Sequence, residues 1–153
     1  MSTNETLIKQ IEEAQKAWGD GIVSIGKEEL AIETFVKDLY YFEGEEFKTL
    51  FKPTLTSFIT SKERVIEYFE GFARNPRIKK VWFNNWEILP IDKNLDPTKQ
   101  SVIVNGVYNF LTRDNVITAE YSFVYRFDFN SDNKSASKHT ILLQHSSLPM
   151  PLG

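Results

Sequence analysis

The sequence VITAEYSFVYRFDF at residues 116–129 places an apolar side chain at every second position. This set comprises Ile117, Ala119, Tyr121, Phe123, Tyr125, Phe127 and Phe129. The intervening polar set comprises Thr118, Glu120, Ser122, Arg126 and Asp128. Because successive side chains of a strand point to opposite faces, this period of two predicts a long antiparallel strand with one buried face. The run KHTILLQHSS at residues 138–147 follows a polar turn and predicts its partner strand.

Further strands are predicted upstream of this pair. Residues 81–91 and 101–112 predict two long strands, and Asp114-Asn115 predicts the tight turn that leads into residue 116. A short strand at residues 47–52 should stop at Pro53, because proline cannot donate to a sheet.

The N-terminal half of the chain predicts three amphipathic helices. A capping box at residues 2–5 precedes apolar residues at spacings of three and four, namely Leu7, Ile11, Ala14, Trp18, Ile22 and Ile25. Gly19 and Gly21 weaken this helix and predict a kink or an early end. A second helix is expected from Glu28, and a capping box at residues 60–63 opens the third. Helices followed by antiparallel strands predict an α+β domain, with the helices packed on one face of a curved sheet.

Composition excludes several classes of function. The chain has 153 residues, 41% of them apolar, which predicts one domain spanning residues 1–153. The net charge of -3 gives no reason to expect a nucleic-acid partner, and no apolar run is long enough to span a membrane. The absence of cysteine removes disulfides and thiolate chemistry. The polar N-terminus lacks the apolar segment of a signal peptide, so a cytoplasmic location is expected.

Four stretches carry a family resemblance: LFKPT at residues 50–54, Tyr68-Phe69, GVYNF at residues 106–110 and HSSLP at residues 145–149. With the order of the elements, they resemble the nuclear transport factor 2-like superfamily. Within it, the chain is similar to bacterial proteins related to the calcium/calmodulin-dependent protein kinase II association domain and to SnoaL-like proteins. The resemblance implies a cone-shaped, cystatin-like fold with a cavity between helices and sheet. It also implies a homodimer, or a larger homo-oligomer, that forms through the sheet.

The sequence departs from that family pattern at two positions. Family members often carry a second histidine just before the position of His145, where this chain has Gln144. Many also carry an arginine just before the third helix, where this chain has Phe58-Ile59-Thr60. Both changes weaken the expectation of the usual polar pocket, and an anionic ligand would lose its counter-charge.

Candidate catalytic residues follow from general acid/base chemistry in a buried cone, as in ketosteroid isomerase. His145 lies on a strand face shared with Ile141, Leu143 and Ser147, where an imidazole could transfer protons. Glu120 is the candidate carboxylate base, and Tyr40 or Tyr108 a phenolic donor. The set expected to bind a small hydrophobic or carboxylate ligand is Tyr108, Lys52, Thr54 and Ser147. Strand pairing register decides which face lines the cone, so Glu120 belongs either to the site or to a dimer interface.

Other chemistries are disfavoured by spacing. His139 and His145 are six residues apart on one strand, about 20 Å, so they should not share a metal ion, and no cofactor is expected. Trp82, Asn84 and Trp86 are expected to share one strand face, either in the core or in an interface. Two functions remain open: a small-molecule-binding, SnoaL-like enzyme, or a homo-oligomeric association module without activity.

Overall fold

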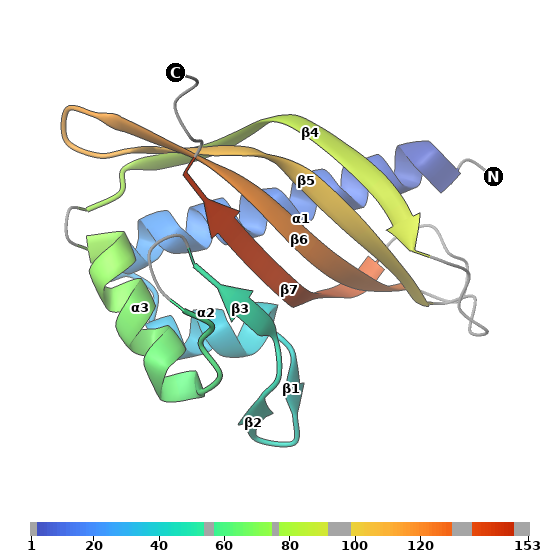
Figure 1. Ribbon diagram of the computed structural model, residues 1–153, viewed down its shortest axis with the longest axis horizontal. Coiled ribbons are helices and arrows are strands. Elements are labelled where there is room, and N and C mark those ends of the chain that lie inside the picture. Colours follow the sequence, from blue (N-terminus) through green and yellow to red (C-terminus); the bar gives the residue numbers. More distant parts are fainter. Residues whose placement is uncertain (1–2, 54–56, 75–76, 92–98, 130–135, 149–153) are drawn as a thin grey trace.

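The computed structural model describes residues 3–53, 57–74, 77–91, 99–129 and 136–148. Among them lie the helices α1 (Thr3–Gly26), α2 (Ile32–Leu39) and α3 (Lys62–Arg74). The strands are β1 (Phe42–Glu43), β2 (Glu46–Phe47), β3 (Leu50–Lys52), β4 (Lys80–Ile91), β5 (Lys99–Leu111), β6 (Val116–Phe129) and β7 (Ala136–Ser147). Figure 1 shows α1 running along one face of the long strands, with α2 and α3 beside it. No helix in the described part of the chain is long and apolar enough to cross a membrane.

The first helix does not end early at its glycines, as the sequence suggested it could. It continues through Gly19 and Gly21, which lie where other elements approach closely: a Cβ on Gly21 would lie 2.5 Å from the ring of Phe35. The second helix was predicted to begin at Glu28, and this was wrong. Glu28 has a φ of 60° and closes the C-terminus of α1, so α2 begins only at Ile32.

The main sheet has the strand order β3-β7-β6-β5-β4, which confirms the predicted α+β fold with a mainly antiparallel sheet. β3 pairs in parallel with β7, and all other pairs of this sheet are antiparallel. The predicted strand at residues 47–52 is divided instead. Its start forms β2, which pairs with β1 across a turn containing Gly44 at φ 63°, and its end forms β3.

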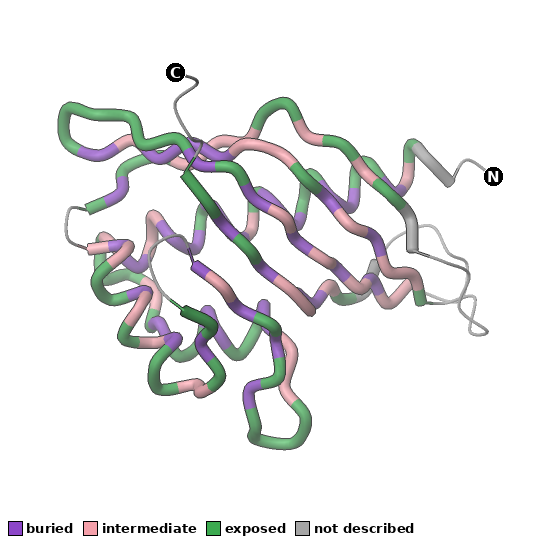
Figure 2. Tube along the Cα trace, in the orientation of Figure 1, coloured by how far each residue is buried: buried purple, intermediate pink, exposed green. Residues whose placement is uncertain are grey.

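The aromatic face of β6 is buried against α1, as the alternation predicted. We call this side of the sheet the inner face and the opposite side, which no helix covers in Figure 1, the outer face. Figure 2 shows the burial alternating along the central strands. The apolar stripe of α1, from Leu7 to Ile25, is buried in the same core.

Two of the register shifts in the sheet change the predicted sharing of faces. Val124 pairs with Leu143 but Tyr125 pairs with Ile141, so Leu142 is an extra residue in β7. Ile141 is therefore buried on the inner face, and its predicted sharing of a face with His145 was wrong.

A second shift lies in β4. Asn84 pairs with Val107 and Glu87 pairs with Asn105. Both pairs lie on the outer face, but two residues separate them in β4 and only one separates them in β5. Trp86 packs on the inner side against Gly106 and does not share the face of Trp82 and Asn84, contrary to the prediction.

Candidate functional site

Five tyrosines point into the space between the sheet and the helices. We call them the inner tyrosine cluster: Tyr40, Tyr68, Tyr108, Tyr121 and Tyr125. They come from four segments, namely the end of α2, α3, β5 and β6. On β5 and β6 the strand period of two brings them to the inner face. The cluster therefore depends on the whole fold rather than on one local motif.

Side-chain amides and an indole hold these phenols in place. Trp18 Nε1 donates to Tyr40 Oη at 3.0 Å, and Tyr40 Oη donates to Gln144 Oε1 at 2.5 Å. Gln15 Nε2 donates to Tyr121 Oη at 3.0 Å. The chain from α1 through Tyr40 to β7 thus satisfies polar atoms that would be costly to bury unpaired.

Burial keeps the cluster protonated. Desolvation raises the pKa of Tyr40, Tyr108 and Tyr125 well above the ordinary value of 10, and for Tyr40 and Tyr108 hydrogen bonds with Trp18 and Gln144 act in the opposite direction. Burial also raises the pKa of Tyr68 and Tyr121. Electrostatic coupling of Tyr125 with Tyr40, Tyr108 and Tyr121 adds to its shift. At neutral pH the cluster offers O–H donors and not phenolate bases.

One hydroxyl of the cluster has no partner. Tyr125 is 0% exposed, and its Oη makes no hydrogen bond in the described structure. Its neighbours Tyr40 and Tyr121 are paired. Buried hydroxyls are normally satisfied by protein or water, so this atom indicates a position for a ligand or water oxygen.

Aromatic rings fill most of the surrounding volume. The Trp18 ring stacks on Tyr108 with centroids 5.4 Å apart and meets Phe123 edge-on at 5.8 Å. Tyr108 stacks on Tyr121 at 4.8 Å. Such packing favours a ligand of a few atoms over a multi-ring ligand.

A groove between α1 and β4 reaches the edge of this cluster. It has a volume of about 250 Å³, and Gln15, Gly19, Phe83 and Trp86 are among its lining residues. Gln15 also binds the Tyr121 hydroxyl, so the groove ends one hydrogen bond from the inner tyrosine cluster. We call it the α1–β4 groove.

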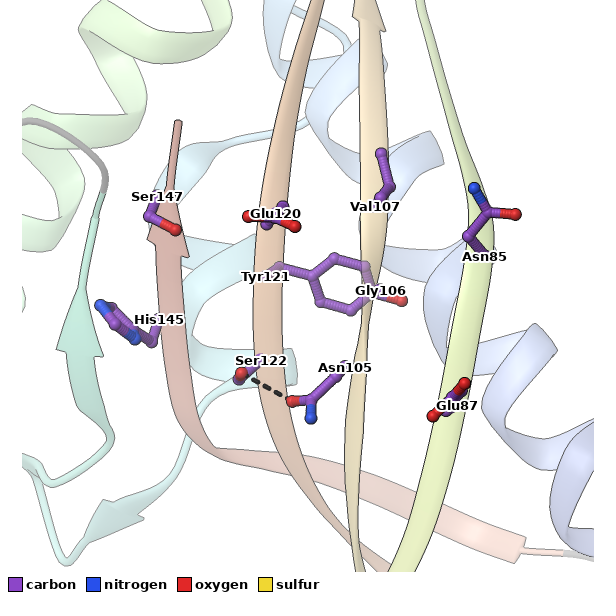
Figure 3. Close-up of a pocket in the computed structure, with 10 residues that line it drawn as sticks. All are labelled: Asn85, Glu87, Asn105, Gly106, Val107, Glu120, Tyr121, Ser122, His145 and Ser147. Atoms are coloured by element: carbon purple, nitrogen blue, oxygen red, sulfur yellow. Dashed lines mark hydrogen bonds between the residues drawn. The ribbon is translucent and has the colours of Figure 1, made fainter. Parts of the chain in front are cut away.

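A larger groove of about 540 Å³ lies on the outer face (Figure 3). Its lining residues come from β4 to β7: Asn85, Glu87, Asn105, Gly106, Val107, Glu120, Tyr121, Ser122, His145 and Ser147. Ser122 Oγ donates to Asn105 Oδ1 at 2.7 Å, which Figure 3 marks. Register places Glu87, Asn105, Ser122, His145 and Lys52 in one polar row across the five strands.

The predicted site residues are divided between the two faces. Tyr40 and Tyr108 lie in the inner cluster, whereas Glu120, His145 and Ser147 line the outer groove. Lys52 also belongs to the outer face, where its partner in β7 is His145. Thr54 lies outside the described residues. Glu120 and His145 are therefore on the face opposite to the phenols with which they were grouped.

Sequence reasoning did not single out Tyr121, Tyr125, Gln15 or Trp18 as site residues. Tyr121 and Tyr125 were visible as members of the aromatic face of β6, but that pattern is equally typical of a plain core. Gln144 was noticed only as a departure from the family pattern, yet it accepts the Tyr40 hydrogen bond. No local signal in residues 140–147 marks Gln144 as a member of the site, because its partner Tyr40 comes from another element.

No group of three or more histidine, cysteine, aspartate or glutamate side chains that could hold a metal ion occurs in the described residues. His139 pairs with Phe127 on the inner side of β7, and His145 lines the outer groove. Opposite faces thus separate the two histidines, in addition to their distance along the strand.

Comparison with known proteins gives a family match and several similar folds. The sequence profile of a family described as metal-independent carbonic anhydrase matches residues 9–148. No match was found among functionally curated proteins.

Three solved structures illustrate the fold. A protein from Parabacteroides distasonis, provisionally named a ketosteroid isomerase, is 17% identical with a TM-score of 0.57, over 99% of this chain and 92% of that one. A protein from Catenulispora acidiphila is 10% identical with a TM-score of 0.64, over 95% and 93%. A nuclear transport factor 2-like protein from Streptomyces avermitilis, provisionally named a dehydratase, is 9% identical with a TM-score of 0.57, over 97% and 100%. At these identities the likeness confirms the nuclear transport factor 2-like fold and nothing finer.

Proposed function

The chain belongs to the metal-independent carbonic anhydrase family, and on that premise we propose that its inner tyrosine cluster interconverts carbon dioxide and bicarbonate. The cluster binds the linear substrate among neutral phenols. Hydration takes place there with a water molecule as the nucleophile. Glu120, His145 and Ser147, which line the outer groove, take no part in this reaction.

The chemistry requires stabilisation of negative charge. Water oxygen attacks the carbon of carbon dioxide, one C–O π bond breaks toward its oxygen, and the water gives up one proton to leave bicarbonate. Preorganised donors aimed at oxygens that gain charge are the largest single aid to such a step. Buried phenols with raised pKa values remain donors throughout, as the reaction needs.

The observation that carries the proposal is the unpaired hydroxyl of Tyr125. It is fully buried, and burial raises the pKa of Tyr125, with smaller electrostatic contributions from Tyr121, Tyr40 and Tyr108. A bicarbonate or carbon dioxide oxygen at this point would accept the missing hydrogen bond. A small substrate is sufficient to provide the hydrogen-bond acceptor that the Tyr125 hydroxyl lacks.

Access and size are consistent with a three-atom substrate. The α1–β4 groove is lined in part by Gln15, whose side-chain amide donates to the Tyr121 hydroxyl. Ring packing around Trp18 and Tyr108 favours small ligands. The same packing argues against polycyclic substrates.

The test is stopped-flow measurement of carbon dioxide hydration by chelator-treated protein, with Tyr125→Phe as the variant. We expect the wild type to accelerate hydration after chelation. Tyr125→Phe should lower the rate on the order of 10²-fold, because one donor to the developing charge is lost. Its stability should not fall, since the removed hydroxyl makes no hydrogen bond.

Tyr41→Phe is the matched control. Tyr41 is half-buried beside Arg126, whose guanidinium lies 5.9 Å from its ring on the other side of the sheet. The Tyr41→Phe variant should hydrate carbon dioxide at the wild-type rate. A wild type without activity, or a Tyr125→Phe variant with full activity, would contradict the proposal.

A second candidate function, homo-oligomeric association, rests on the outer face. Register aligns five apolar residues in one row across all five strands: Leu50, Leu143, Val124, Ile103 and Leu89. We call it the outer apolar row. Leu89 is 63% exposed and Leu50 59% exposed. A continuous apolar row on an uncovered sheet face is typical of an interaction surface, and we propose a second copy of this chain as its occupant.

A further inference from the structure

Each hydration event releases one proton, and the inner tyrosine cluster has no group to accept it. The phenols stay protonated because their pKa values are raised by burial, and the Gln144 amide does not titrate. A working site therefore needs a proton acceptor next to the cluster and a route from it to solvent.

His139 lies at the required place on β7. It faces inward opposite Phe127, and its ring centroid is 6.4 Å from that of Tyr125, with the planes at 80°. The side chain is half-buried, and its Nε2 is buried without a hydrogen-bond partner in the described structure. Two neighbouring aromatic residues of the inner face thus each hold one unsatisfied polar atom.

Buried polar atoms without a protein partner are typically satisfied by water or ligand, and the two rings that carry these atoms are neighbours, with centroids 6.4 Å apart. Tyr125 Oη can accept one proton and donate another, and His139 Nε2 can accept one when it carries none. Hydrogen-bonded groups of these two kinds, with an intervening water, form a path along which a proton moves without displacing heavy atoms.

The outer end of the path lies at α1. Glu13, an exposed residue of α1, acts on His139 electrostatically. The ring of Tyr125, a second titratable side chain, packs against the imidazole. Burial lowers the pKa of His139 below its ordinary 6.5, and Glu13 opposes this in part. The imidazole is therefore neutral at pH 7 and free to accept a proton.

We propose that Tyr125 and His139 form a relay that carries the proton of hydration from the inner tyrosine cluster to solvent beside Glu13. The inference rests on the proposed function. It assigns His139 a role in proton transfer without contact with the substrate.

The step balances as follows in the hydration direction. The attacking water loses a proton to Tyr125 Oη while the Tyr125 hydroxyl proton moves to His139 Nε2. The renewed Tyr125 O–H then donates to an oxygen of the bicarbonate that forms, so Tyr125 ends unchanged. His139 becomes an imidazolium and passes one proton to a buffer base. The sum is carbon dioxide and water converted to bicarbonate, with the buffer base protonated.

The experiment compares wild type, His139→Ala and His139→Gln by stopped-flow hydration, first in a bulky buffer and then with added imidazole. Both variants should lose about tenfold in rate, and imidazole should restore His139→Ala, because the small base enters the vacated space. Lys138→Ala, an exposed neighbour on the same strand, is the matched control and should keep the wild-type rate. Unfolding midpoints show which variants are folded.

The pH profile separates the relay from a structural role. Only neutral His139 accepts a proton, so the wild-type rate should rise with pH, with a midpoint below 6.5. The same midpoint should appear in the NMR titration of the His139 ring, and this limb should be absent in both variants. Tyr125→Phe should shift the NMR midpoint of His139.

The outcomes distinguish the two proposals. If the wild type does not hydrate carbon dioxide, both fall. If it does and folded His139 variants keep its rate and pH profile, only the relay is overturned. A rate loss that imidazole does not restore, with an unchanged pH limb, would also overturn it, since it would mark His139 as a packing residue.

Discussion

At the scale of single residues, the inner and outer sides of β7 have opposite roles. Gln144 and Ser146 are buried, whereas His145 between them is exposed. Gln144 accepts the hydrogen bond of Tyr40, which itself accepts from Trp18. One amide thus ties α1 and the end of α2 to β7. Its neighbour His145 is exposed and lines the outer groove.

Replacing Gln144 should therefore lower the stability of the fold, whereas replacing His145 should not. Gln144→Leu leaves the Tyr40 hydroxyl without an acceptor, and we expect the free energy of unfolding to fall by about 1–3 kcal/mol. His145→Leu is the matched control on the other face and should change it by less than about 0.5 kcal/mol. Urea unfolding measures both.

A double-mutant cycle sharpens this test. Tyr40→Phe removes the donor, so the double variant Tyr40→Phe with Gln144→Leu should lose less stability than the sum of the two single variants. Additive losses would show that Tyr40 and Gln144 do not depend on each other.

At the scale of elements, register shifts determine which side chains reach the inner face. In β4 the shift between Asn84 and Glu87 includes Asn85 at φ 52° and turns Trp86 toward Gly106. Glycine leaves room at this point for both Trp86 and the hydroxyl of Tyr121. The irregularity of one strand thus positions a phenol of the inner tyrosine cluster.

Adding a methyl group at Gly106 tests that arrangement. Its Cβ would lie 2.6 Å from Trp86 Cβ and 2.9 Å from Tyr121 Oη, so Gly106→Ala should destabilise the protein by about 1–3 kcal/mol through overpacking. Gly71→Ala in α3 is the control with the opposite sign. Nothing lies within 4 Å of its Cβ, and alanine should stabilise the helix by about 0.5–1 kcal/mol.

Thermal unfolding followed by circular dichroism compares the two alanine variants directly. Equal midpoints for both would contradict the close packing of β4 on β5 at Gly106. A lower midpoint for Gly106→Ala together with lower hydration activity would link the bulge to the inner tyrosine cluster.

At the scale of the whole molecule, the two faces of the sheet are unequal. Helices and rings cover the inner face, while the outer face combines the outer apolar row with the polar row that contains His145. A stable interface needs roughly 1,000 Å² or more of buried surface. The outer face extends over the long strands β4 to β7, and the exposed Leu50 and Leu89 lie at the two ends of the row.

Charge in the middle of the outer apolar row should prevent association. We expect the wild type to sediment as a dimer at micromolar concentration and Val124→Glu as a monomer, because a carboxylate would be buried without a partner. Thr34→Glu on α2 introduces the same charge on another surface and should remain dimeric. A monomeric wild type in sedimentation velocity would remove the second candidate function.

Local pattern was sufficient for most of the architecture. The period of two in residues 116–129 predicted β6 with its bounds and its buried aromatic side, and the apolar spacing in residues 7–25 predicted the buried stripe of α1. These signals are local because a side chain's direction in a helix or strand follows from backbone geometry alone. They also predicted an α+β fold before any contact was known.

Tertiary structure alone decided which residues form the candidate site. The bulges at Leu142 and near Asn85 depend on how paired strands meet, and each one reverses the facing of the residues that follow it. The inner tyrosine cluster gathers side chains from α3, β5, β6 and the end of α2, with Gln144 from β7, over long sequence separations. Pairing register and packing bring them together, and neither is encoded in any single stretch of the chain.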